Sequence, residues 1–271
     1  MKEQHNQLDP KKIISVISPE NRSFLTRLEV FQSIDSTNSY LLAQLKNSFS
    51  QSQPGSWVCF AEEQTQGRGR QGKTWYSPYG ANIYCSLTWI FPAKFAGISA
   101  LSIACGLLLI QSLNKLGLYQ GLSLKWPNDI LFLGRKLGGI LIENLASPTQ
   151  NRMVIGIGLN VNLSPEANTD WISVFQALDQ VVSRNLVAGI VADEFLSGIR
   201  IFEQQGLKPF LPLLLQYDYL RGKTVRVLRP QGVLEGIAQG LNEAGEFLLL
   251  DQEGKSQVFS YGEVSLRLKS D

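Results

Sequence analysis

The chain has 271 residues, 44% of them hydrophobic and 18% charged, so it can form one large domain with a smaller one beside it. Its net charge of +2 provides no strong overall field for nucleic acid or membrane. The only histidine, His5, lies in a polar N-terminal segment, which excludes Ser-His-Asp and Cys-His triads and His-based metal sites. The cysteines Cys59, Cys85 and Cys105 show no C-x-x-C spacing and predict buried, reduced thiols of a cytoplasmic protein.

The first part of the chain predicts strands and a helix. Residues 1–24 are polar and poorly periodic, so we expect an N-terminal tail with at most a short helix. Alternating apolar residues predict strands at 27–34, 56–63 and 80–91. After the first of these, Asp35 or Ser36 is suited to cap a leucine-rich helix.

An uncharged stretch at 96–113 is long enough to suggest a membrane span. Serine and glutamine side chains interrupt it, and no second such stretch exists, so we expect a buried helix that ends at Gly117. The polar first residues predict no secretory signal, and we expect no membrane partner.

The second half begins with more predicted strands. Residues 122–144 predict three strands with a hairpin turn at Gly134, and residues 152–163 predict a fourth. Residues 187–220 predict two helices, the second rich in leucine and tyrosine.

The pattern of apolar and turn residues changes near residue 221. From there, short apolar segments alternate with turn residues, which predicts a small all-β barrel. We therefore expect three parts: an N-terminal tail at 1–24, a mixed α/β domain at 25–219 and a β-barrel domain at 220–271.

Residues 67–74, GRGRQGKT, match the P-loop pattern G-x-x-x-x-G-K-[ST]. A P-loop requires a helix that begins at its G-K-T residues, because the N-terminal amides of that helix bind phosphate. Pro78 and Gly80 would break such a helix, and the following residues predict a strand. We therefore predict a glycine-rich loop, not a P-loop. Arg68 and Arg70 can contact phosphate or carboxylate groups there, and a solvated basic turn is the alternative.

Further motifs accompany this loop along the chain. They are STN at 36–38, KWPNDI at 125–130, RKLGGILIE at 135–143 and GIGLNVN at 156–162. In this order and at these spacings, over roughly residues 30–270, the chain resembles the biotin–protein ligases (biotin–[acetyl-CoA-carboxylase] ligases). The resemblance implies an α+β fold: a mixed sheet with helices, as in the class II synthetase-like catalytic domain of this family, followed by a small SH3-like β-barrel.

The resemblance implies a two-step reaction that uses biotin, ATP and Mg²⁺. Biotin and ATP would form biotinoyl-5′-AMP and pyrophosphate, and a lysine of the biotin carboxyl carrier protein of acetyl-CoA carboxylase would then displace AMP. Such chemistry needs positioning and cations rather than an enzyme nucleophile, which agrees with the single histidine. We find no winged-helix segment and expect no specific DNA binding. Exposed edges of the sheet would allow a homodimer, although no motif requires one.

The same resemblance assigns site residues. Lys136, Arg70 and Asp129 are expected to act in catalysis: Lys136 on developing charge, Arg70 over the adenylate, and Asp129 on the lysine or on Mg²⁺. The residues expected to bind biotin are Ser36, Thr37, Asn38, Gln64, Gly67, Arg68, Gly69, Arg70, Lys136, Gly139, Gly156 and Gly158. Those expected to bind ATP or the adenylate are Arg70, Trp75, Asn128, Lys136 and Asn160.

Each role has a structural alternative. Ser36 could serve only as a helix cap, Asp129 only in a turn, Trp75 only in the core, and Lys136 only as a solvated hairpin residue. Glu143 is expected at a strand end rather than in catalysis.

Two other function classes compete. A lipoate- or octanoate-type ligase or acyltransferase would share the catalytic fold, but the β-barrel and the arginine-bearing loop favour biotin. A nucleic-acid binder could use the same loop with Trp75 and Tyr76, but the net charge of +2 disfavours it. Gln71 and Lys73 depart from the more arginine-rich loops of the family, so the roles of these two positions stay open.

Overall fold

The computed structural model describes residues 7–47, 55–95, 97–163, 169–229, 232–260 and 265–268, so His5 lies outside the described residues. The α-helices are α1 Pro10–Val16, α2 Pro19–Arg22, α3 Thr37–Asn47, α4 Leu101–Lys115, α5 Val174–Leu178, α6 Arg184–Gln205 and α7 Leu211–Tyr217. The first strands are β1 Leu25–Phe31, β2 Ser56–Ala61, β3 Ile83–Pro92, β4 Leu122–Lys125, β5 Asp129–Phe132, β6 Arg135–Ala146 and β7 Gln150–Leu159. The last strands are β8 Thr224–Arg229, β9 Gly232–Leu241, β10 Phe247–Asp251, β11 Ser256–Phe259 and β12 Ser265–Leu268.

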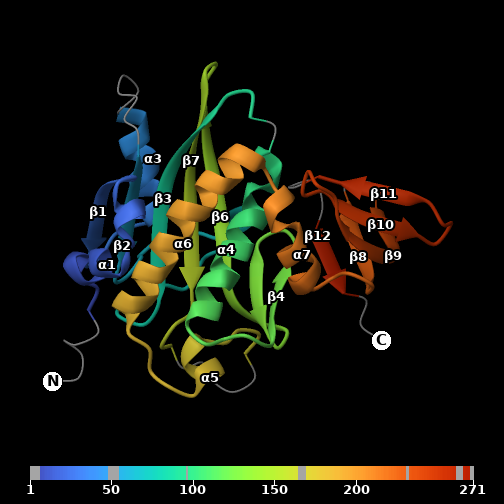
Figure 1. The fold of residues 1–271 in the computed structure, drawn as a ribbon. Coiled ribbons are helices and arrows are strands. Elements are labelled where there is room, and N and C mark those ends of the chain that lie inside the picture. The colour runs from blue at the N-terminus through green and yellow to red at the C-terminus, as the bar shows by residue number, and fades with distance from the viewer. Residues whose placement is uncertain are drawn as a thin grey trace.

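These strands form two sheets (Figure 1). The first has the order β1-β2-β3-β7-β6-β5-β4, with β1 and β2 parallel and the other neighbours antiparallel. The second is antiparallel, with the order β11-β10-β9-β8-β12. A mixed sheet with helices, followed by a separate antiparallel sheet, confirms the fold class expected from the sequence.

Helices cover both faces of the seven-stranded sheet, because alternate strand residues point to opposite faces. On the face covered by α4 and α6, Val58 and Ile155 belong to the main core. On the opposite face, their neighbours Cys59 and Val154 pack with Leu41 of α3. All three cysteines are buried and free, as predicted.

The apolar stretch at 96–113 contributes most of α4. Within the described chain, Ile98–Lys115 is the one stretch long and apolar enough to cross a membrane, and 72% of it is buried inside the protein. α4 packs against α6 and the sheet, as Figure 1 shows. The predicted buried helix is therefore present.

Trp126 is a main contact between the C-terminal sheet and the rest of the chain. Trp126, just after β4, donates from Nε1 to the carbonyl of Gly245 at 3.2 Å, and its ring lies 5.6 Å from that of Phe247. Ser99 donates to the carbonyl of Ala244 at 3.1 Å. These contacts hold the second sheet against the segment that follows β4 and against the turn that precedes α4.

The N-terminal segment differs from the predicted tail. Residues 7–24 form α1 and α2, which pack against α6, and Ile13 and Ile17 are fully buried. The backbone of Leu8 donates to Glu62 at 2.6 Å, and Asp9 donates to Asn185 at 2.7 Å. The segment is held both by these polar contacts and by a few buried apolar residues, which are too few to produce a clear apolar periodicity in the sequence.

Replacing Asp193 with alanine should loosen this segment. Its Oδ1 accepts from Ser18 N and Oγ and from Asn21 Nδ2 at 2.7–2.9 Å. Burial raises the pKa of this carboxyl, but the hydrogen bonds from Asn21 and Ser18 outweigh it and hold the pKa below its ordinary value. Losing these bonds at a partly exposed site should lower the free energy of unfolding by about 1–2 kcal/mol at pH 7.

The effect should depend on pH. A carboxyl with a lowered pKa stabilises the folded state above its unfolded-state pKa of about 4, and this contribution disappears as pH falls through the folded-state value. Urea titrations of both proteins between pH 3 and pH 7 measure the difference. A difference that stayed constant over this range would contradict a role for the ionised carboxylate.

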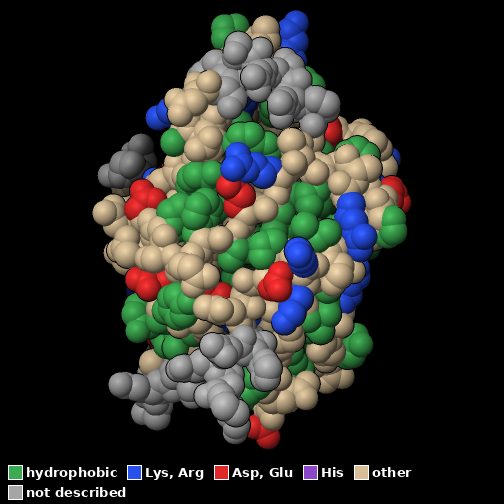
Figure 2. Space-filling view, turned by 90° about the vertical axis from the view of Figure 1, so that its left-hand side faces the viewer, with side chains coloured by type: hydrophobic (Ala, Val, Ile, Leu, Met, Phe, Trp, Pro, Cys, Tyr) green, Lys and Arg blue, Asp and Glu red, His purple; other side chains and the backbone are tan. Residues whose placement is uncertain are grey.

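The surface on the β1 side carries mixed chemistry (Figure 2). Basic side chains stand among acidic and hydrophobic ones over this face. This mixture agrees with the small net charge of the chain and does not resemble the basic surface of a nucleic-acid-binding protein.

Candidate active site

A cavity of about 220 Å³ lies on the α3 side of the sheet, beside the N-terminus of that helix. It collects residues from the predicted motifs although they are far apart in sequence. Its lining includes Ser36, Thr37, Asn38, Gln64, Arg68, Gly69, Arg70, Trp75, Asn128, Asp129, Lys136, Gly139, Gly156 and Gly158. Gly67 lines an adjoining hollow under the same loop, and Asn160 is absent from the lining of the cavity.

The glycine-rich loop (residues 67–74) covers this cavity and is not a P-loop. A single 3₁₀ turn at Arg70–Gly72 is followed by extended backbone, and the next strand or helix after this turn is β3. Gly69 N donates to the carbonyl of Lys73 at 2.6 Å, which closes the turn. No helix begins at Lys73 and Thr74, so the rejection of the P-loop on Pro78 is confirmed.

Lys136 and Asp129 form the charged centre of the cavity. Lys136 Nζ lies 2.6 Å from Asp129 Oδ1, and both side chains are about one-third exposed. The two residues lie on adjacent strands, β6 and β5, near a register irregularity after Ile130. The geometry fits an aspartate that orients the lysine.

Arg70 reaches the same end of the cavity. Its Nη1 donates to Asn128 Oδ1 at 3.2 Å, and Asn128 Nδ2 donates to the carbonyl of Ile140 at 2.8 Å. Asn128 therefore connects the glycine-rich loop to β6. Asn160 has a different role, because its side chain is buried and donates to the carbonyl of Ile172 at 3.1 Å.

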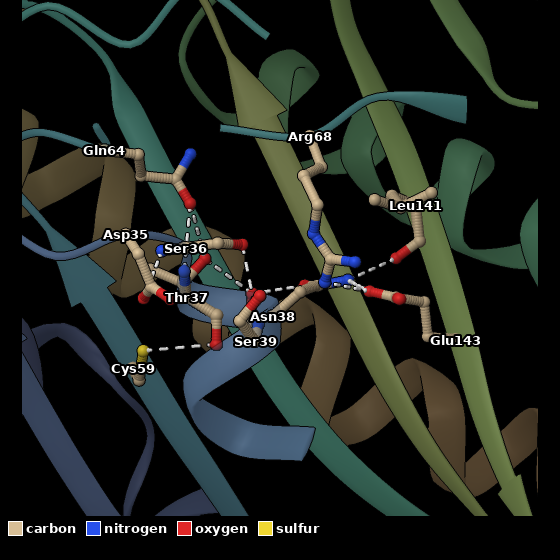
Figure 3. A network of polar contacts seen from close by, with 11 residues as sticks. Asp35, Ser36, Thr37, Asn38, Ser39, Cys59, Gln64, Arg68, Leu141 and Glu143 are labelled. Carbon is tan, nitrogen blue, oxygen red and sulfur yellow. Dashed lines mark hydrogen bonds and ion pairs between the residues drawn. The ribbon is translucent and has the colours of Figure 1, made fainter. Parts of the chain in front are cut away.

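Uncharged polar groups form the floor of the other end (Figure 3). Gln64 Oε1 accepts from Thr37 N at 3.0 Å and from Thr37 Oγ1 at 3.2 Å. Ser86 Oγ lies 2.7 Å from Thr37 Oγ1 and 2.5 Å from Asn38 Oδ1. Ser36 caps α3 through the backbone of Ser39 at 3.4 Å and also lines the cavity, so its role as a cap leaves its predicted contact with biotin open.

Glycines of β6 and β7 leave room for this arrangement. A Cβ on Gly156 would lie 2.3 Å from Asn38 Oδ1, and one on Gly158 would lie 2.5 Å from Trp75 Cε2. The Trp75 ring packs close to Gly158, and Lys136 Nζ lies 5.3 Å from its centroid. Gly156 and Gly158 are therefore required because the side chains of Asn38 and Trp75 approach their backbone closely.

Some lining residues were absent from the predicted set. Lys125 is half-buried, and burial lowers its pKa below the ordinary value even though Asp129 opposes this shift. Arg267 of β12 also lines the cavity. The KWPND motif contains Lys125 and offered a signal for it, whereas no local pattern marks Arg267.

The chain matches known protein families over most of its length. Residues 30–160 match the biotin/lipoate A/B protein ligase family, and residues 221–267 match the biotin protein ligase C-terminal domain. The bifunctional ligase/repressor BirA of Salmonella typhimurium is 34% identical over 266 residues, which cover 96% of this chain and 78% of that protein. The biotin–[acetyl-CoA-carboxylase] ligase of Mycobacterium tuberculosis is 34% identical over 244 residues, 88% of each chain.

Solved structures agree with these sequence matches. The biotin protein ligase from Aquifex aeolicus in complex with biotin and ATP superposes with a TM-score of 0.76 at 28% identity. The superposition covers 90% of this chain and 100% of the A. aeolicus chain. Fold, site and sequence together show that the chain belongs to the biotin protein ligase family.

Proposed function

We propose that this protein is an ATP-dependent biotin–protein ligase. The observation that carries this proposal is that the two ends of one cavity differ in chemistry. Uncharged hydrogen-bonding groups of Thr37 and Gln64 form one end, and Lys136 beside Asp129 forms the other. The first end suits the neutral ureido head of biotin, and the second suits a carboxylate that reacts with a phosphate. The A. aeolicus relative in complex with biotin and ATP supports both substrates.

In the first step, a biotin carboxylate oxygen attacks the α-phosphorus of ATP and pyrophosphate leaves. The Lys136 ammonium stabilises the negative charge that grows on the α-phosphate oxygens. Asp129, at 2.6 Å, fixes the position of that ammonium. Trp75 presents a flat face beside this end for the adenine base.

In the second step, the amine of an acceptor lysine attacks the acyl carbon of biotinoyl-AMP. The bond from this carbon to the AMP oxygen breaks, and the amine loses a proton. Between the two steps, the glycine-rich loop shields the mixed anhydride from water. Arg70 holds the loop over the site through Asn128.

We infer that magnesium reaches this site on the phosphates of ATP. The described part of the chain contains no group of three His, Cys, Asp or Glu residues that could hold a metal. Mg²⁺ commonly binds to one or two carboxylates together with substrate phosphates, and Asp129, whose Oδ1 contacts Lys136, would be the carboxylate at this end of the cavity. Magnesium would neutralise charge on the polyphosphate.

The acceptor that we propose is the biotin carboxyl carrier protein of acetyl-CoA carboxylase. Relatives named biotin–[acetyl-CoA-carboxylase] ligase in M. tuberculosis and Paracoccus denitrificans support this choice. Three free, buried thiols support a reducing, cytoplasmic setting. A homodimer would use an exposed sheet edge such as β1, and we propose no specific DNA binding.

Calorimetry with biotin, followed by biotin-dependent exchange of pyrophosphate into ATP, tests the proposal. We expect biotin to bind and to support exchange only with ATP and magnesium present. Exchange supported by lipoate and not by biotin would instead assign the chain to a lipoate-type activity. Salt-sensitive binding to random DNA without affinity for biotin would assign it to the nucleic-acid binders.

Replacing Arg70 with glycine should release biotinoyl-AMP prematurely. The variant loses the charged contact with Asn128, so the adenylate should dissociate about 10–100-fold faster. Released adenylate acylates exposed lysines, and biotin on bystander proteins such as serum albumin measures the effect. Unchanged selectivity for the acceptor would contradict the covering role of the loop.

A further inference from the structure

Glu143 occupies a position that the reaction scheme does not use. It was expected at a strand end, but β6 continues beyond it to Ala146. One of its carboxylate oxygens, Oε2, accepts from Arg68 Nη2 at 2.8 Å and from Asn38 Nδ2 at 2.8 Å (Figure 3). A single oxygen thus joins the glycine-rich loop to the N-terminal turn of α3.

The hydrogen bonds continue from Asn38 back to the loop. Ser86 Oγ donates to Asn38 Oδ1, Thr37 Oγ1 lies within hydrogen-bond distance of Ser86 Oγ, and Thr37 N donates to Gln64 Oε1. Gln64 Nε2 then donates to Ser77 Oγ at 3.1 Å, and Ser77 Oγ donates to the carbonyl of Trp75 at 3.0 Å.

The whole set forms a polar circuit with defined members. The circuit runs through Arg68, Glu143, Asn38, Ser86, Thr37, Gln64, Ser77 and Trp75. It starts on the glycine-rich loop, crosses the floor of the cavity, and returns at the residue that follows the loop. Members of such a circuit constrain one another's positions, so a ligand bound to the floor also restrains both ends of the loop.

We infer that Glu143 is a positioning residue that couples biotin contact at the floor to closure of the glycine-rich loop; this rests on the proposed biotin ligase function. Its carboxylate is the only charged acceptor in the polar circuit, and Arg68 is the only cation. Asn38 is buried and in direct contact with Glu143, so ordering of Asn38 by a bound ligand orders Glu143 and, through it, Arg68. Glu143 itself acts through these two residues rather than on the reacting atoms.

The release rate of bound adenylate tests this inference. Labelled biotinoyl-AMP is formed on the enzyme and chased with an excess of unlabelled adenylate. In Glu143→Gln, which keeps the shape and loses the charge, we expect release about tenfold faster, as for one charge-assisted hydrogen bond at a partly exposed site. The melting temperature reports whether the fold is intact.

A matched control is available on the C-terminal sheet. The pair Arg226–Glu235 has the same chemistry at 2.7 Å, with side chains 48% and 23% exposed against 41% and 26% for Arg68–Glu143. Glu235→Gln should leave adenylate release unchanged.

A double-mutant cycle separates positioning from general stability. Once Arg68 is replaced by methionine, Glu143→Gln should change release by less than twofold, because the charged partner is already gone. Trypsin gives a second readout, since it cleaves after Arg68, Arg70 and Lys73. Adenylate should protect these bonds in the wild type and protect them less in Glu143→Gln.

Several outcomes would overturn the inference. They are release from Glu143→Gln at the wild-type rate, strictly additive effects in the cycle, or equal protection from trypsin. A wild-type protein that retains no labelled adenylate would instead contradict the proposed function, so the two failures are distinguishable.

Discussion

Replacing Lys136 with alanine should reduce biotin-dependent adenylate formation by about 10²–10³-fold. The ammonium lies 2.6 Å from Asp129 at the cationic end of the cavity, where charge develops on the α-phosphate and on the acyl oxygen. Removing one such group from a closed site costs roughly 3 kcal/mol in the transition state. Exchange of pyrophosphate into ATP measures the first step, and single-turnover transfer from preformed adenylate measures the second.

Both steps should be slowed. Lys136 stabilises the charge that develops on the α-phosphate in the first step and on the acyl oxygen in the second. Lys255→Ala is the control, since that lysine is 70% exposed and pairs with Glu253 at 2.9 Å on the C-terminal sheet. The melting temperature of Lys136→Ala should stay close to that of the wild type, because the side chain is only partly buried. Turnover within a few-fold of normal would remove Lys136 from the mechanism.

Replacing Gly158 with alanine should weaken adenylate formation by about 100-fold with little loss of stability. The added methyl would lie 2.5 Å from Trp75 Cε2 and 2.9 Å from its Nε1, so the ring must move by roughly 1 Å. A displacement of this size in a positioning residue costs about two orders of magnitude in rate. Calorimetry with ATP, alone and after biotin, together with pyrophosphate exchange, measures the loss.

Gly139→Ala provides a comparison in the same cavity. Its methyl would meet Lys136 and Asp129 at 3.5–3.6 Å, which is ordinary contact, so the loss should remain below about tenfold. Equal losses in the two variants would show that the Trp75 ring is not the cause of the Gly158 effect.

The sequence predicted the parts of the site that depend on local order. Asp129 and Lys136 lie in one hairpin, so their pairing follows from a short segment whose turn at Gly134 was recognisable. The rejection of the P-loop depended likewise on Pro78, a few residues beyond the motif. Such short-range signals can be read from the sequence because residues that are close in sequence remain close in the fold.

Contacts between segments that are distant in sequence were harder to predict from the sequence. Glu143 lies 75 residues from Arg68, and nothing in the RKLGGILIE motif indicates which cation it meets. Ser86 is a buried polar residue in a mostly apolar strand, and its register opposite Gly156 brings it into contact with Thr37 and Asn38. For the N-terminal segment we expected a tail or a short helix, and its two packed helices were not foreseen because hydrogen bonds such as that of Leu8 to Glu62 hold much of the segment in place.

Because Arg267 lines the cavity, the pocket cannot be complete until this late part of the chain has been synthesised. The ribosome completes Gly158 and the rest of the floor 267 − 158 = 109 residues before it reaches Arg267. At translation rates of about 5–20 residues per second, this interval lasts roughly 5–20 s. During that time a nascent chain can shape a partial pocket for biotin, but its wall on the side of the last strand is still missing. Completion of the pocket therefore waits for synthesis of β12 and not only for folding of the seven-stranded sheet.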